Sequence, residues 1–305
     1  MDAVVFGNVT LDVICRTVNE VPRYESIAFD DVVLSPGGCA SNVAIGLGCL
    51  GISTALICRM GADDAAEMIQ KTWLKFGLDL RFVQQKANWK TAVSIGLVDN
   101  EAQPRFIHTP GANATLTSID LDVDRIVAEG ARLVHVAGFF VLPGLLDGKL
   151  PYQLEIAQKQ GLATCLDVVF SPRYWKPEYL WPCLPVIDIF MCNRKEAEKL
   201  TGESQADNAA CFFKNRGAQV VIIKLGGDGC YVDSEDYVGI KQAPKVNVVD
   251  TTGAGDAFAA GLIAALLDNK GIEKSVEAGN DAGALMVSAP GAIGGWINKI
   301  NLPVD

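Results

Sequence analysis

The sequence predicts an α/β protein with a doubly wound, mainly parallel central sheet and a small attached β-sheet. Two observations support this prediction. Short, almost continuously apolar runs alternate with helical patterns through most of the chain, as in strands buried on both faces of a parallel sheet. Residues 13–35 and 91–109 instead hold strand-like runs with polar alternation and no helix between them, which indicates antiparallel strands outside the main sheet.

The expected elements follow each other in regular order. Strands of the main sheet are predicted at residues 3–6, 54–58, 133–137, 163–167, 187–192 and 220–225. Helices are predicted at residues 40–50, 65–76, 151–160, 194–200 and 208–215. The uncharged run 282–298 contains Pro290 and four glycines, so we expect a helix followed by a loop there, not a membrane span.

The two irregular stretches have a functional interpretation. We expect residues 1–305 to form a single domain, with 13–35 and 91–109 forming a lid over a site at the edge of the parallel sheet. The alternative is a peripheral decoration without a role in binding. If the lid exposes an apolar face, a second copy of the chain would bury it in a homodimer.

Composition limits the kinds of partner. The chain has a net charge of -10, which argues against nucleic acid because phosphate backbones bind clustered Lys and Arg. Nine cysteines without a Cys-x-x-Cys pair, together with only two histidines, make a zinc site improbable and fit reduced thiols in a cytoplasmic protein. The N-terminal Met-Asp-Ala-Val-Val-Phe-Gly is typical of a strand, not of a signal peptide.

The segment from Asp250 to Asp256 carries the clearest chemical signal. Gly253, Ala254 and Gly255 precede an apolar helix and let backbone N–H groups approach a ligand. The first N–H groups of a helix lack internal partners and carry partial positive charge, so they suit an anion whose charge grows during a reaction. Asp256 is then placed to act as a base. The alternative is a glycine-rich loop with an aspartate near an N-cap.

Two other segments suit a hydroxylated ligand. Gly38 and Asn42 lie in a second glycine-rich helix start, where Asn42 offers both a donor and an acceptor. Asp12 follows the first strand, at the end where ligand-binding groups gather in such folds. The alternatives are a small-residue turn packed on the sheet and a solvated loop aspartate.

Two further segments have equally strong structural explanations. Asn193 and Glu196 have the spacing of a capping box, or they hold a hydrated magnesium ion, which needs few protein carboxylates. The segment 224–231 suits a hairpin turn. It would also let backbone pass close to a nucleotide, with Lys224 near phosphates.

Together and in this order, these segments resemble the ribokinase-like (PfkB) family of carbohydrate and nucleoside kinases, over essentially all 305 residues. Residues 36–51 are similar to the first family signature, and residues 248–266 to the second, which is highly specific. The resemblance implies transfer of the γ-phosphoryl group of ATP to a sugar hydroxyl. Asp256 would take the hydroxyl proton, and the amides of Gly253, Ala254, Gly255 and Asp256 would form an anion hole.

The resemblance also implies roles for the other residues. Sugar hydroxyls would bind Asp12, Gly38 and Asn42, while Asn193 and Glu196 would organise Mg²⁺ and phosphates. The nucleotide would lie against Lys224, Gly226, Gly227 and Gly229, with Asn280 near adenine. A K⁺ ion would lie beside the anion hole, at Asp250, Thr252 and backbone oxygens around Met286, Ala289, Gly291 and Gly295.

The chain departs from familiar subfamilies where the sugar is selected. Several sugar kinases have an Asp-Pro-Asn-x-Arg motif, of which only Asp167 is present here, and residues 138–143 lack the glutamate usual in ribokinases. The sequence therefore assigns no particular sugar. Phe139 and Phe140 either stack on a ligand or lie in the core, and Arg105 either meets an anionic substrate or is solvated.

Other functions stay open or fit less well. A nucleoside kinase on the same scaffold is the nearest alternative, and a catalytically silent sugar-binding protein is a more distant one. A dehydrogenase fits worse, because the segment after the first strand lacks the Gly-x-Gly-x-x-Gly pattern of dinucleotide-binding folds.

Overall fold

The computed structural model describes residues 1–101 and 104–300. Residues 102 and 103 of the predicted lid segment 91–109, and residues 301–305 of the predicted domain, lie outside this description. The strands of the main sheet are β1 (Ala3–Gly7), β4 (Thr54–Gly61), β5 (Val83–Lys86), β8 (Leu133–Ala137), β9 (Ala163–Asp167), β10 (Ile189–Asn193), β11 (Val220–Lys224), β12 (Cys230–Asp233) and β13 (Val238–Lys241). Among the described residues they form one nine-stranded sheet in the order β13-β12-β11-β10-β9-β8-β1-β4-β5.

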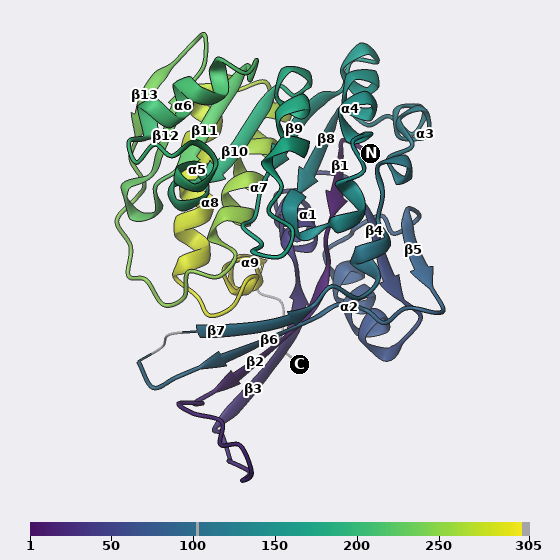
Figure 1. The fold of residues 1–305 in the computed structure, drawn as a ribbon, viewed down its shortest axis with the longest axis vertical. Coiled ribbons are helices and arrows are strands. Elements are labelled where there is room, and N and C mark those ends of the chain that lie inside the picture. Colours follow the sequence, from purple (N-terminus) through teal and green to yellow (C-terminus); the bar gives the residue numbers. More distant parts are fainter. Residues whose placement is uncertain (102–103, 301–305) are drawn as a thin grey trace.

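From β11 to β5 in this order, neighbouring strands run parallel. At the other edge of the sheet, β12 and β13 pair antiparallel. Helices cover both faces (Figure 1). One layer consists of α1 (Cys39–Cys49), α2 (Asp64–Lys75), α7 (Ala254–Leu267), α8 (Gly271–Val287) and α9 (Gly294–Ile300). The other consists of α3 (Val123–Ala128), α4 (Leu150–Lys159), α5 (Arg194–Thr201) and α6 (Ala206–Lys214). The predicted doubly wound, mainly parallel fold is confirmed.

The central strand shows why the sequence pattern is apolar throughout. In β1, Ala3 and Val5 belong to the core beneath α1 and α7, whereas Val4 and Phe6 belong to the core on the opposite face. All four residues are fully buried. Side chains of a strand alternate between the two faces, so a strand covered on both sides needs apolar residues at every position.

The small sheet projects from one end of the main sheet (Figure 1). Its strands β2 (Thr10–Arg16), β3 (Asp31–Gly37), β6 (Val93–Val98) and β7 (Pro104–Thr109) lie in the order β3-β2-β6-β7. The predicted small sheet is therefore present, but the expectation of antiparallel pairing throughout was wrong. β2 and β6 run parallel, because the chain returns through the main sheet between them.

The C-terminal region also differs from the prediction. The run 282–298 was expected to be a helix followed by a loop, but the chain turns at residues 288–293 and forms α9. Trp296 explains this, since its buried side chain joins the core between α1 and α8. None of the helices in the described ranges is long and apolar enough to cross a membrane.

Candidate active site

The N-terminus of α7 is open toward a ligand. Its N-cap residue Gly253 has a φ of 75°, and no side chain caps the helix. A Cβ at Gly253 would lie 2.6 Å from the carbonyl oxygen of Ala292, so this position requires glycine. The Ala254 N–H, predicted to belong to an anion hole, donates to the Thr251 carbonyl at 3.3 Å. The amides of Gly253, Gly255 and Asp256 have no acceptor within the described chain and can bind an anion.

Asp256 lies in the first turn of α7 and faces α1. Asn42 of α1 donates from Nδ2 to Asp256 Oδ2 at 2.8 Å. The two helices approach closely because Gly46 has no side chain, and a Cβ there would lie 2.7 Å from Ala260 Cβ. Burial, followed by the negative charge of Asp167, raises the pKa of Asp256 to about 7. The site therefore holds a carboxylate that can accept a proton near neutral pH.

Asp12 lies where the lid joins the main sheet. Its strand β2 pairs with β3, which leads directly into α1. Thr10 Oγ1 donates to Asp12 Oδ1 at 2.6 Å, and a Cβ at Gly37 would lie only 2.0 Å from Asp12 Oδ2. Burial raises the pKa of Asp12 to about 6. Gly37 thus lets a buried carboxylate pack beside the start of α1, while Gly38 lets the backbone of residues 8 and 9 approach.

A half-buried lysine brings positive charge to the same region. Lys224 ends β11, and a Cβ at Gly255 would lie 3.1 Å from Lys224 Nζ. Burial alone would lower the pKa of this lysine, but the carboxylates of Asp167, Glu196 and Asp256 raise it above its ordinary value. Lys224 therefore stays charged next to the open amides of α7, where both would attract a phosphate group.

Asn193 and Glu196 form the predicted capping box at the start of α5. Asn193 Oδ1 accepts from the Glu196 amide at 2.9 Å, and Glu196 Oε2 accepts from the Asn193 amide at 2.8 Å. Glu196 Oε1 also accepts from the amide of Phe170 at 3.2 Å. Burial raises the pKa of Glu196. Both carboxylate oxygens keep a free lone pair, so a water ligand of Mg²⁺ could bind there.

The glycine-rich turn lies beside Lys224, between β11 and β12. Gly226 and Gly227 belong to a short 3₁₀ turn, and a Cβ at either residue would meet open space. Gly229 instead packs against β13, where a Cβ would lie 1.9 Å from the Lys241 carbonyl oxygen. Asn280 of α8 donates from Nδ2 to that same carbonyl at 3.1 Å. Asn280 thus holds the end of β13 near the turn.

The residues of the expected K⁺ site surround Asp250. Its Oδ1 accepts from the amide and hydroxyl of Thr252 at 2.9 and 2.7 Å, and its Oδ2 accepts from the Gly291 amide at 2.9 Å. The carbonyl of Met286 accepts from the Ala289 amide. Gly295 packs against this turn, since a Cβ there would lie 2.7 Å from the Leu285 carbonyl. The fold brings these distant segments together.

Other expected residues take structural positions. Arg105 is exposed on β7, and its Nη2 donates to the carbonyls of Val18 and Asn19 at 2.6 and 3.0 Å. Arg105 therefore braces the lid and makes no contact with the residues around Asp256. Phe139 and Phe140 are fully buried and pack edge to face, so they belong to the core.

The sequence analysis did not assign two buried polar residues near the site. Asp167 Oδ1 accepts from the Gly138 amide at 2.8 Å, and its Oδ2 lies 3.8 Å from Nε2 of His135. Asn8 follows β1, and its Oδ1 has no donor among the described residues, as is also true of Asn42 Oδ1. Both missed residues lie at carboxyl ends of parallel strands, which is the signal that could have identified them.

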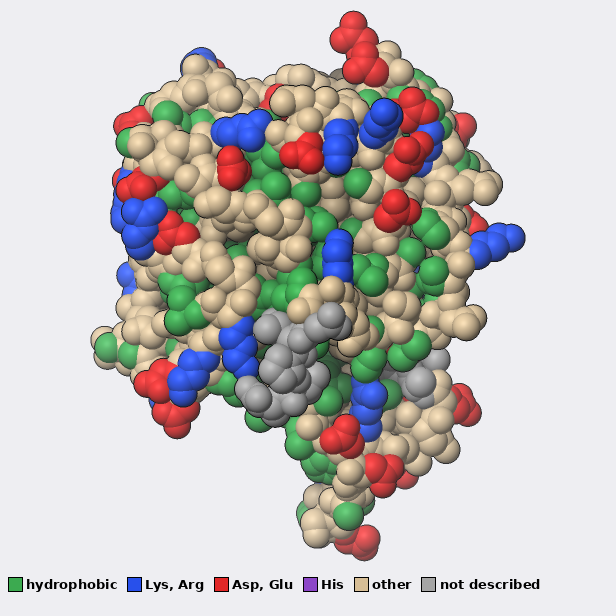
Figure 2. Space-filling view, turned by 180° about the vertical axis from the view of Figure 1, so that it is seen from behind, with side chains coloured by type: hydrophobic (Ala, Val, Ile, Leu, Met, Phe, Trp, Pro, Cys, Tyr) green, Lys and Arg blue, Asp and Glu red, His purple; other side chains and the backbone are tan. Residues whose placement is uncertain are grey.

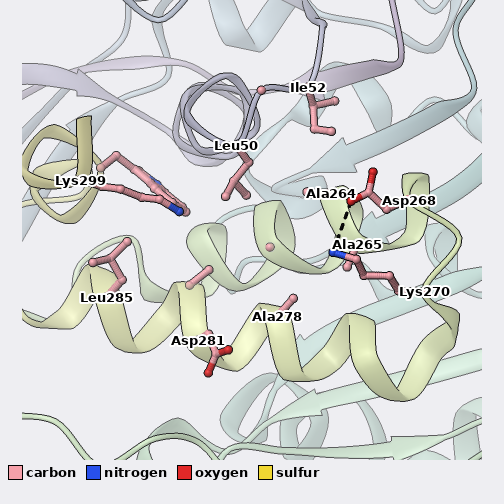
Figure 3. Close-up of a pocket in the computed structure, with 14 residues that line it drawn as sticks. Leu50, Ile52, Ala264, Ala265, Asp268, Lys270, Ala278, Asp281, Leu285 and Lys299 are labelled. Carbon is pink, nitrogen blue, oxygen red and sulfur yellow. Dashed lines mark ion pairs between the residues drawn. The ribbon is translucent and has the colours of Figure 1, made fainter.

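A separate open hollow of about 470 Å³ lies between α1, α7, α8 and α9. Figure 3 shows Ala264 of α7 and Ala278 of α8 on neighbouring helices, with Asp268 just after α7 and Lys299 of α9 on another side. None of the site residues expected from the sequence lines it. The hollow is therefore distinct from the region around Asp256.

Comparison with known proteins identifies the family of the chain. The family model described as pfkB family carbohydrate kinase matches residues 1–299. Mouse ribokinase is 28% identical over 99% of this chain and 93% of its own length. Fructokinase-1 of Oryza sativa subsp. japonica is 29% identical over 94% and 92% of the two chains. The structure of Arabidopsis thaliana ribokinase complexed with ribose and ATP has a TM-score of 0.82, with 23% identity and 99% coverage of both chains. The chain therefore belongs to the pfkB family of carbohydrate kinases.

Proposed function

We propose that the protein is an ATP-dependent sugar kinase, which transfers the γ-phosphoryl group of ATP to a hydroxyl of a small carbohydrate. One observation carries the proposal: a partly buried Asp256, held by Asn42, lies at the open N-terminus of α7. The similarity to a ribokinase and a fructokinase supports the reaction class.

The proposed mechanism uses the α7 N-terminus for both proton transfer and charge stabilisation. The Asp256 carboxylate accepts the proton of the sugar hydroxyl, whose oxygen forms a bond to the γ-phosphorus while the bond to the β-phosphate oxygen breaks. The amides of Gly253, Gly255 and Asp256 and the Lys224 ammonium stabilise the negative charge on the transferred group, whereas the Ala254 amide already donates to the Thr251 carbonyl. This fits phosphoryl transfer, which depends mainly on positioning and electrostatics.

On the sugar side, we propose that hydroxyls bind Asp12, the backbone at Gly38, and Asn42. Asp12 and Asn42 are both buried, and Asn42 Oδ1 and Asn8 Oδ1 have no donors within the described residues. A buried acceptor without a donor is costly. Sugar hydroxyls would supply the missing hydrogen bonds at these two oxygens.

On the nucleotide side, we propose that the phosphates lie near Lys224 and that ATP follows the turn containing Gly226, Gly227 and Gly229. Asn193 and Glu196 would hold Mg²⁺ through water. Mg²⁺ would neutralise charge on the phosphates. No cluster of three or more metal-ligating side chains occurs in the described chain, which suits a water-mediated site. Asn280 would act by fixing the end of β13 beside the adenine.

We also propose a K⁺ site formed by Asp250, Thr252 and the backbone oxygens of Met286, Ala289, Gly291 and Gly295. Burial of Asp250 favours its neutral form, but hydrogen bonds from Thr252 and Gly291 lower its pKa below the usual value. A charged oxygen ligand is therefore available to a cation. Replacing K⁺ with a large organic cation should lower activity, and unchanged activity would count against this site.

We further propose that the chain forms one domain and pairs with a second copy through its lid, working in the cytoplasm. Exposed apolar residues gather on the lid: Tyr24, Val32, Val33, Leu34, Phe106 and Ile107. Hydrophobic side chains are visible on this lower lobe in Figure 2. A dimer would remove them from water, and a monomer in sedimentation experiments would contradict the pairing. The nine cysteines are free, which fits a reducing compartment.

The proposed reaction can be tested by one ADP-release screen over pentoses, hexoses, ketodeoxy acids, phosphosugars and nucleosides. ADP release that depends on a sugar supports the proposal. A preference for nucleosides would favour a nucleoside kinase on the same scaffold. Sugar binding without ADP release from any compound would indicate a catalytically silent protein.

A further inference from the structure

Arg16 lies at the end of lid strand β2 and faces the loop that leads into α7. We propose that Arg16 is a positioning residue that couples lid closure to the shape of the anion-binding helix start, by pairing with Asp250. The inference rests on the proposed kinase function, because it assigns a role to the lid during phosphoryl transfer at Asp256.

The first observation is a contact between the lid and the body of the molecule. Arg16 Nη2 lies 4.0 Å from Asp250 Oδ2, and the two side chains are 35% and 23% exposed. The pair is therefore partly shielded from water, unlike a fully solvated surface pair. Arg16 belongs to the small sheet, whereas Asp250 lies between β13 and α7.

The second observation is that Arg16 has an unused donor. Its Nε is buried and has no acceptor among the described residues. A buried N–H without a partner is unfavourable. A small movement of the lid toward the body would shorten the contact with Asp250 and let the guanidinium make a charge-assisted hydrogen bond, which is stronger than a neutral one.

The third observation is that Asp250 connects two loops. Asp250 Oδ1 accepts hydrogen bonds from the amide and the hydroxyl of Thr252, and Asp250 Oδ2 accepts one from the Gly291 amide. The backbone amides of Val249 and Asp250 also donate to the Val287 carbonyl. A change in the position of this carboxylate would therefore shift both the loop before α7 and the turn after α8.

These loops fix the helix start. Gly253 packs against Ala292, since a Cβ at Gly253 would lie 2.6 Å from the Ala292 oxygen and 2.8 Å from its Cα. Gly291, held by Asp250, directly precedes Ala292. A continuous path of contacts thus leads from Arg16 through Asp250 and residues 291–292 to Gly253. Closure of the lid over a bound sugar would hold the amides of α7 in their productive arrangement.

The test compares three single variants in steady-state kinetics. Arg16→Gln removes the charge and should lower kcat roughly 5- to 50-fold, with less change in KM for the sugar because the pair acts in the closed complex. Arg16→Lys should recover part of this loss. The matched control is Arg23→Gln, an exposed lid arginine with no ion pair in the described part of the chain, which should keep wild-type kinetics.

A double-mutant cycle tests the path through Asp250. If Arg16 acts through this carboxylate, adding Arg16→Gln to Asp250→Asn should cause little further loss of kcat. Losses that simply multiply would overturn the proposed coupling. Thermal unfolding of Arg16→Gln should stay close to wild type, since a general loss of stability would mean that Arg16 only supports the fold.

The remaining outcomes separate the two proposals. Active wild-type protein whose Arg16→Gln variant equals Arg23→Gln would overturn the role of Arg16 and leave the kinase assignment intact. Wild-type protein that releases no ADP with any acceptor would overturn the proposed function, and the role of Arg16 with it.

Discussion

Two helix starts on this protein carry a carboxylate that is shielded from water near Lys224, yet they differ in what they offer a ligand: Glu196 is buried and Asp256 is partly buried. At α5, Asn193 and Glu196 cap the helix reciprocally. At α7, no side chain caps the helix, and its N-cap Gly253 has a left-handed backbone. Asp256 turns away from the α7 amides toward Asn42, whereas Glu196 accepts from backbone amides.

This difference teaches that a helix N-terminus binds an anion only when its own side chains leave the amides free. At the α5 start, the capping box takes up the amides of Asn193 and Glu196, and we assign the Glu196 carboxylate to a metal-bound water. At the α7 start, the amides of Gly253, Gly255 and Asp256 and the Asp256 carboxylate are available together. We therefore assign phosphoryl transfer to α7 and a supporting role to α5. Variants at the two helix starts should therefore differ in their effect on catalysis.

The largest effect is expected from Asp256→Asn. The amide cannot accept the hydroxyl proton, so kcat should fall roughly 10²- to 10⁴-fold. The fold should survive, because an asparagine oxygen can still accept the hydrogen bond from Asn42. Steady-state ADP release measures kcat, and circular dichroism checks the fold. A kcat near the wild-type value would remove Asp256 from the reaction.

The next effect concerns the open amides. Gly253→Ala places a methyl group within contact of Ala292 and strains a left-handed residue, so kcat should fall roughly 10- to 100-fold and stability by about 1–3 kcal/mol. Gly51→Ala is the matched control: its φ is 80°, and a Cβ there meets nothing within 4 Å. Gly51→Ala should lose some stability but keep kcat. Equal kcat in both variants would contradict the role of the α7 amides.

A smaller effect is expected at α5. Glu196→Gln keeps an oxygen that accepts from the Asn193 amide but removes the charge and the hydrogen bond from the Phe170 amide, so KM for MgATP should rise about tenfold with only a small loss of thermal stability. The control Glu198→Gln changes an exposed glutamate on the same helix and should leave KM unchanged. A Glu196→Gln variant that unfolds more easily with normal KM would show that the capping box is the residue's whole function.

The sequence predicted the architecture well because burial on both faces of a sheet leaves a clear apolar pattern. Strand pairing in the lid was harder to predict. The polar alternation of residues 13–35 and 91–109 identified strands, but periodicity does not give the direction in which distant strands pair. α9 was missed because its helix depends on burial of Trp296, and Gly294 and Gly295 at its start are poor helix formers.

In the candidate site, too, local features could be predicted and contacts between distant segments could not. Local motifs identified Asp256 and the capping pair, since the spacing of a helix start is visible in a few residues. The neighbours that tune the site come from other strands, and no local pattern shows how close they lie to Asp256. Asp167 and Lys224 come from β9 and β11, and only the fold puts their charges beside Asp256. For Arg105, the sequence predicted a place in the small sheet but not its hydrogen bonds to the Val18 and Asn19 carbonyls.

The smallest expected effect is a shift in the pH dependence of kcat/KM, which tests whether Asp256 of α7 is the base. Burial raises the pKa of Asp256 to about 7, with Asp167 as the next contributor. Only the ionised carboxylate accepts a proton, so kcat/KM should rise as pH increases through about 7 and level off above it. Asp167→Asn removes a negative charge that opposes ionisation of Asp256, so the rise should move to lower pH.

Asp167→Asn keeps an oxygen that can accept the Gly138 amide, and the change should therefore act mainly through charge. The control Asp236→Asn removes the same charge from an exposed position between β12 and β13 and should leave the profile in place. If both variants gave the wild-type profile, the limiting group would not be Asp256. Glu196, whose pKa burial also raises, would then be the group to test, and the division between α7 and α5 would have to be reversed.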